Sequence, residues 1–137
     1  MVLRNERGTA AVELALLAPV LVVLVSVVVA AGRLVETKSA LLSVAREAAR
    51  AASEAPDPAG ARDAALATAN DVAAGLGLDP ARLRVTQDPG AFGRGDPYEV
   101  SVSYTVRLAD LPGLGLLPGS FVLEADHTEL VDRFKSQ

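Results

Sequence analysis

The 137-residue sequence contains no cysteine, no tryptophan and a single histidine, and only 4% of its residues are aromatic. The absence of cysteine excludes disulfide bonds and thiolate metal sites, although it does not fix the cellular compartment. The net charge of −4 argues against a nucleic acid partner, because phosphate binding requires a basic face. Half of the residues are hydrophobic, mostly alanine, valine and leucine, so the function must be sought in the apolar pattern.

The motifs of common enzyme and cofactor sites are also missing. The sequence has no HExxH, no P-loop, no dinucleotide fingerprint and no nucleophile elbow. The single histidine, His127, lies between Asp126 and Glu129 in an expected strand, which is typical of a surface or hydrogen-bonded histidine rather than a metal ligand. We therefore predict that the protein is not an enzyme and has no catalytic residue, metal ion, cofactor or small-molecule substrate.

Residues 14–32 form an uncharged apolar run, LALLAPVLVVLVSVVVAAG. As a helix, this run would span about 28 Å, close to the roughly 30 Å hydrocarbon core of a bilayer. A buried core helix is disfavoured, because so small a domain cannot cover it on every side. We predict a single-pass membrane helix over residues 9–33. Basic residues lie on both sides of it, at Arg4 and Arg7 and again at Arg33 and Lys38, so the positive-inside count does not decide the orientation.

A secretory signal is the alternative interpretation of the same segment. Residues 1–8 would be its basic n-region, and cleavage near Ala31 would release a secreted or periplasmic non-catalytic binding module starting near Gly32. However, the run exceeds the usual h-region of about 7–15 residues. The helical pattern also continues past Ala31. A single-pass anchor with no role in assembly is a third reading.

An acidic residue, Glu13, lies at the start of the apolar run, five residues after Gly8. A charge well inside a bilayer costs about 2.5–3.5 kcal/mol, although one near the edge costs less. If a peptidase cuts between Gly8 and Thr9, the new amine lies one helical turn before Glu13. That amine, from the same or a neighbouring subunit, would neutralise the carboxylate and set the register between subunits. Pro19 lies inside the expected helix and predicts a kink.

The string from Gly8 to Pro19, GTAAVELALLAP, resembles the start of TadE-like proteins, minor pilin-like components of the tight-adherence (Flp) pilus system. Leu14 stands where phenylalanine is common in that family. The resemblance implies cleavage after Gly8 by a prepilin peptidase on the cytoplasmic side, and hence a cytoplasmic N-terminus and an extracytoplasmic C-terminal part. It also implies a place in the inner membrane, in or at the base of a pilus, with other pilin-like subunits and the pilus assembly machinery as partners.

After the apolar run the sequence predicts an α+β fold. Residues 34–55 form an amphipathic stalk helix, continuous with the membrane helix apart from a mild break near Gly32, with Leu41, Ala45, Ala48 and Ala52 as its apolar seam. Residues 45–50 also resemble the run that follows the membrane helix in TadE-like proteins. Residues 61–137 form an extracytoplasmic domain with helices on one face of a small antiparallel sheet, an arrangement that resembles pilins.

Within this domain the sequence predicts one helix, three strands and two loops. The helix covers residues 61–75, with apolar positions at Leu66, Ala67, Ala69, Ala73 and Ala74. Strands are expected at 83–86, 98–108 and about 121–131, and the alternation YEVSVSYTVRL predicts that the middle strand buries Tyr98, Val100, Val102, Tyr104, Val106 and Leu108. Residues 88–97 predict a hairpin connection. The apolar loop 110–119 either covers the core, touches the bilayer or meets a partner.

Overall fold

The structure, a computed structural model, describes residues 6–131, and the side chains of residues 10–131. This part of the chain divides into two compact units. The first contains the chain up to Leu34 together with Arg107–Gly119, and the second contains Val35–Val106 and the chain from Ser120 onward.

Helix α1 (Glu6–Glu54) contributes its first part to one unit and its remainder to the other. It runs through Gly32 as one helix, so the expected mild break is wrong. A single glycine costs a helix only about 1 kcal/mol relative to alanine, which a helix of this length tolerates. Alanine dominates its last turns, and it ends before Pro56, where the sequence predicts a stop.

In the second unit, α1 buries a seam of small and branched residues. The predicted seam positions Leu41, Ala45, Ala48 and Ala52 are fully buried, together with Val44 and Ala49, which the sequence interpretation did not include. Alanine at most of these positions lets neighbouring elements approach the helix backbone closely. The seam is thus occupied within the chain itself.

Helix α2 (Pro58–Gly75) begins three residues before its predicted start. Asp57 caps it, since its carboxylate accepts a hydrogen bond of 2.8 Å from the Gly60 N–H, and Pro58 occupies the first turn. The buried face consists of four alanines at a spacing of four residues, Ala61, Ala65, Ala69 and Ala73. Of the predicted apolar positions, Ala69 and Ala73 are therefore right, whereas Leu66, Ala67 and Ala74 are exposed.

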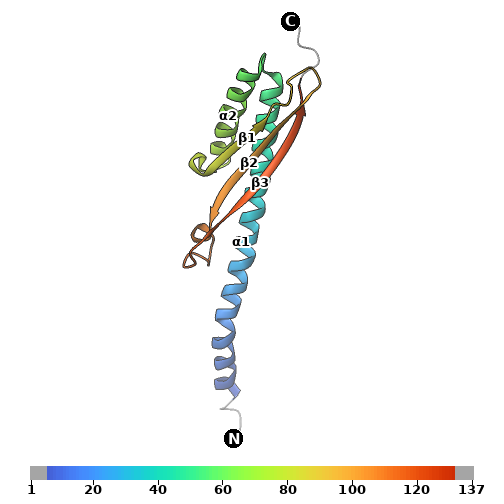
Figure 1. The fold of residues 1–137 in the computed structure, drawn as a ribbon. Coiled ribbons are helices and arrows are strands. Elements are labelled where there is room, and N and C mark those ends of the chain that lie inside the picture. The colour runs from blue at the N-terminus through green and yellow to red at the C-terminus, as the bar shows by residue number, and fades with distance from the viewer. Residues whose placement is uncertain (1–5, 132–137) are drawn as a thin grey trace. The chain divides into compact units, whose positions relative to one another are not determined.

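Three strands form one antiparallel sheet in the order β1 (Leu83–Asp88), β2 (Pro97–Arg107) and β3 (Ser120–Leu130) (Figure 1). β1 pairs with β2 from Leu83 opposite Tyr104 to Asp88 opposite Glu99, which confirms the predicted hairpin. The predicted inner face of β2 is buried at Tyr98, Val100, Val102, Tyr104 and Val106.

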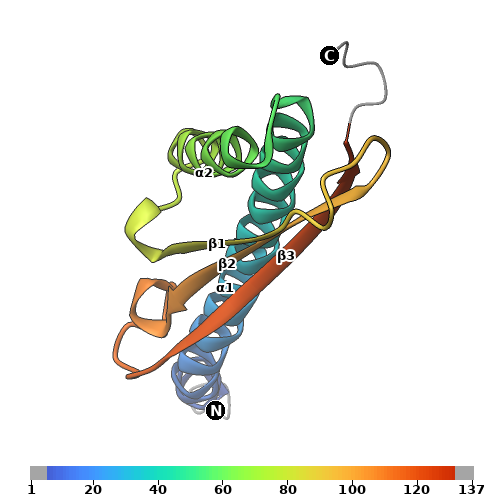
Figure 2. The same ribbon diagram turned by 45° about the horizontal axis from the view of Figure 1, so that its top comes forward.

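Leu108 departs from the predicted strand. It begins the 3₁₀ turn η2 (Leu108–Asp110) instead of extending β2. The chain leaves the sheet at this point, since residues 107–119 belong to the first unit. A second 3₁₀ turn, η1 (Pro80–Arg82), leads into β1. In the second unit, α2 and the later part of α1 cover one face of the sheet (Figure 2), so the predicted α+β class is confirmed.

Candidate functional site

The first part of α1 is apolar, and its large side chains are exposed. Its leucines and valines are each at least 44% exposed; they are Val12, Leu14, Leu16, Leu17, Val20, Leu21, Val22, Val23, Leu24, Val25, Val27, Val28 and Val29. Within residues 10–131, this is the one helix long and apolar enough to cross a membrane. A helix that is apolar all round requires apolar surroundings, so the segment is consistent with a single-pass membrane protein.

Ser26 is the one polar side chain of the apolar run, and it satisfies its own hydrogen bond. Its hydroxyl donates to the carbonyl oxygen of Val22 at 2.9 Å. This internal hydrogen bond lets the serine lie in apolar surroundings without an unsatisfied hydroxyl donor. Ser26 therefore does not interrupt the apolar character of the segment.

Glu13 lies exposed on α1, immediately before the apolar run. An exposed carboxylate is open to a partner from another chain. Gly8 and Thr9, the predicted cleavage pair, lie in the first turns of α1, but their side chains are outside the described part of the chain. Pro19 lies inside α1, where it removes one backbone donor. Cleavage, the role of Glu13 and a kink at Pro19 all stay predictions.

Sequence reasoning missed a contact within the first unit. A Cβ atom added to Gly113 would collide with the Cβ and Oγ atoms of Ser26, so the 107–119 segment lies directly against α1 there. Ser26 is half-buried and Ala30 is buried, whereas their neighbours along the apolar run are exposed. The only hint in the sequence is a glycine, free of side-chain bulk, in an apolar loop.

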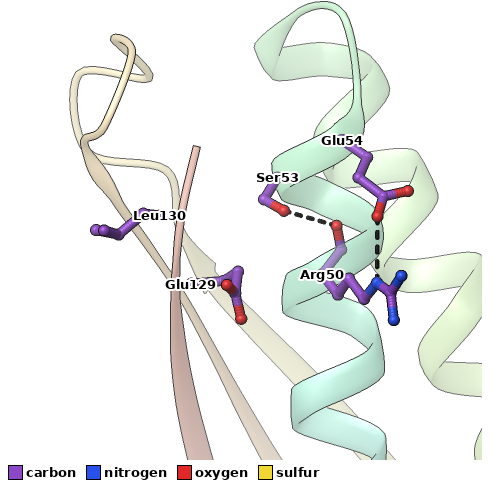
Figure 3. Close-up of a pocket in the computed structure, with 5 residues that line it drawn as sticks. All are labelled: Arg50, Ser53, Glu54, Glu129 and Leu130. Carbon is purple, nitrogen blue, oxygen red and sulfur yellow. Dashed lines mark hydrogen bonds and ion pairs between the residues drawn. The ribbon is translucent and has the colours of Figure 1, made fainter. Parts of the chain in front are cut away.

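A polar pocket of about 440 Å³ lies in the second unit, lined by Arg50, Ser53, Glu54, Glu129 and Leu130 (Figure 3). Arg50 pairs with Glu54 at 3.2 Å, and the Ser53 hydroxyl donates to the Arg50 carbonyl oxygen at 2.8 Å. The hydrogen bond and charge of Glu54, aided by the charge of Glu47, raise the pKa of Arg50. The Arg50 guanidinium is thus paired with a carboxylate of its own helix.

The lone histidine lies on β3, close to the pocket. His127 Nε2 lies 3.4 Å from a carboxylate oxygen of Glu129, and both residues are partly buried on the inner face of β3, as the strand alternation predicts. Among the side chains of residues 10–131, no group of three histidine, aspartate or glutamate residues is placed to hold a metal ion.

The chain is similar to a known protein family over its first part. A family model for TadE-like proteins matches residues 8–50, which confirms the resemblance predicted from the Gly8–Pro19 string and the segment after it. The match fits a membrane protein associated with the Tad pilus. Neither the curated proteins nor the solved structures contain a match to the chain.

Proposed function

We propose that this protein is a membrane-anchored minor pilin or pseudopilin that takes part in assembling a type IVb (Flp/Tad) pilus or a related secretion apparatus. One observation carries the proposal: the leucines and valines of the apolar segment of α1 are exposed, and this segment lies within the stretch that matches the TadE-like family. Such a surface needs lipid or other apolar helices around it. The helix of a pilin-like subunit is surrounded by lipid in the membrane and by the helices of other subunits in the assembly.

The proposed mechanism has three steps. The chain inserts with its N-terminus in the cytoplasm, and a prepilin peptidase cleaves between Gly8 and Thr9. The apolar helix then packs laterally against related subunits while the α+β domain projects outside the cytoplasm. The amine of Thr9, from the same or an adjacent subunit, neutralises Glu13, since a carboxylate in apolar surroundings is stable only when it is paired.

The mature N-terminus tests this function. Mass spectrometry of the protein from its native host is expected to find Thr9 as the first residue. The matched control is the same host without its prepilin peptidase, where the protein should retain Met1. A protein that keeps residues 1–8 in the presence of the active peptidase would contradict the proposal. A soluble fragment starting near Gly32 would instead establish the secreted binding module.

A further inference from the structure

The loop Leu108–Gly119 exposes leucine side chains instead of covering the core with all of them. Leu111 is buried, but Leu116 is 100% exposed and Leu117 is 51% exposed. The chain carries no charge from Leu111 to Leu123. An uncharged loop with exposed leucines is typical of a surface that binds an apolar partner.

The loop packs against the apolar segment of α1. Gly113, at φ +77°, approaches Ser26 too closely to leave room for a side chain. Ser26, Ala30 and Leu34 follow one another at four-residue spacing on α1, and each is less exposed than the residues around it. Loop and helix also belong to the same compact unit. The exposed leucines are therefore held beside the helix that is expected to enter the bilayer.

We propose that this loop is a second membrane contact, in which Leu116 and Leu117 insert among the acyl chains of the leaflet at the C-terminal end of the membrane segment. The proposal rests on the membrane insertion of α1 that the proposed function requires. The occupant is lipid because the loop continues the apolar surface of a helix whose own surroundings are lipid, and because no charge interrupts it.

The loop backbone fixes the depth of this contact. Ser26 lies seven residues before Arg33, which is about 10 Å along a helix axis. If the hydrocarbon core extended to Arg33, irregular backbone would lie well inside it, where its N–H and C=O groups find no partners. We therefore place the edge of the hydrocarbon core near Ser26. Residues 9–26 then span about 27 Å of the roughly 30 Å core, so Glu13 lies inside the other leaflet, close to its edge.

The local hydrogen bonds of the loop suit this interfacial position. Its ends are joined by the Leu108 N–H donating to the Gly119 carbonyl at 3.0 Å. The Leu114 N–H donates to the Leu111 carbonyl at 3.1 Å, and the Leu117 N–H donates to the Leu114 carbonyl at 2.9 Å. Pro112 and Pro118 have no N–H to satisfy. The headgroup region can solvate the remaining N–H groups of the loop.

Single-cysteine labelling tests the contact, because the natural sequence has no cysteine. Full-length Leu116→Cys, labelled with the polarity-sensitive fluorophore nitrobenzoxadiazole, is reconstituted in phosphatidylethanolamine and phosphatidylglycerol vesicles. Nitroxide lipids quench from the acyl chains, and iodide quenches from water. Val20→Cys, in the membrane segment, is the lipid reference, and Leu66→Cys, 48% exposed on α2, is the water reference. Since the Leu116 side chain is fully exposed, its replacement removes no packing within the chain.

The expected result is that the Leu116 label is quenched by nitroxide lipids nearly as strongly as the Val20 label, while iodide quenches only the Leu66 label. An iodide-accessible Leu116 label beside a lipid-quenched Val20 label would overturn the loop contact and leave the anchor intact. A Val20 label in water would overturn both. A Leu116 label shielded from both quenchers would show a protein partner in place of lipid, and lipid quenching at Leu66 would show unspecific adsorption; either would overturn the proposal.

Discussion

Gly113 and Ser26 are 87 positions apart in sequence, yet there is no room for a Cβ atom on Gly113 beside the Ser26 side chain. The glycine also has a φ of +77°, in the left-handed region that residues with a side chain rarely adopt. The lack of space and the positive φ both favour glycine at this position. The contact joins the apolar loop to the apolar segment of α1.

The first prediction concerns this contact. Gly113→Ala should displace the loop from α1, because both the collision with Ser26 and the positive φ oppose it. Overpacking typically costs about 1–3 kcal/mol, so amide hydrogen exchange at Leu114 and Leu117 should accelerate accordingly. Gly115→Ala is the matched control, since an added Cβ there meets only the Ala109 carbonyl at an ordinary 3.6 Å. Equal exchange rates in the two variants would show that the close approach does not hold the loop.

The sequence predicted the elements better than the contacts between them. β2 was predictable because alternate residues of a strand face opposite sides, and its valines and tyrosines follow that period. The start of α2 was missed because Asp57 and Pro58 resemble a turn until the cap is seen. The Ser26 contact could not be predicted, because no local pattern links a helix residue to a loop glycine so distant in the sequence.

The second prediction concerns the carboxylate of the apolar segment. Glu13→Gln should insert into the membrane at least as well as the natural protein, because a charge deep in a bilayer costs about 2.5–3.5 kcal/mol. It should nevertheless fail to join assembled subunits, because the neutral amide cannot form an ion pair with the amine of Thr9. Carbonate extraction measures insertion, and co-purification with the assembled pilin-like subunits measures incorporation. Glu36→Gln, an exposed carboxylate beyond the apolar run of the same helix, is the control. Normal incorporation of Glu13→Gln would remove the role assigned to this residue.

The third prediction concerns the alanine seam of the second unit. Ala48 is fully buried, so Ala48→Leu should overpack the seam and lower the free energy of unfolding by about 1–3 kcal/mol. Denaturant unfolding of the full-length protein in detergent can be followed by tyrosine fluorescence, because both tyrosines lie in β2 and there is no tryptophan. Glu47→Leu introduces the same side chain at the adjacent exposed position, where a change within about 0.5 kcal/mol is expected. Equal loss in both variants would show that the seam is not close-packed.

The fourth prediction concerns Tyr98, the largest fully buried side chain. Its hydroxyl donates to Gln87 Oε1 at 2.5 Å, and its ring meets Phe92 edge to face with the ring centroids 5.9 Å apart. Burial raises the pKa of Tyr98 above its usual value of 10.0, outweighing the nearby charge of Arg62. The folded state therefore resists deprotonation more than the unfolded chain does. This contribution to stability is complete below the unfolded pKa and declines as the pH rises through the folded one.

Tyr98→Phe should separate the contribution of the hydroxyl's hydrogen bond to stability from the contribution of its titration. At neutral pH it should lower the free energy of unfolding by about 1 kcal/mol, the usual net value of one hydrogen bond. Above pH 10 the difference from the natural protein should shrink, because phenylalanine has no proton to lose. Urea unfolding followed by circular dichroism at neutral and alkaline pH measures both. Tyr104→Phe is the control: its hydroxyl only accepts a longer bond, 3.3 Å from the Asp79 N–H, so its loss at neutral pH should be smaller. A constant difference between Tyr98→Phe and the natural protein across this pH range would show that titration of Tyr98 does not contribute to alkaline unfolding.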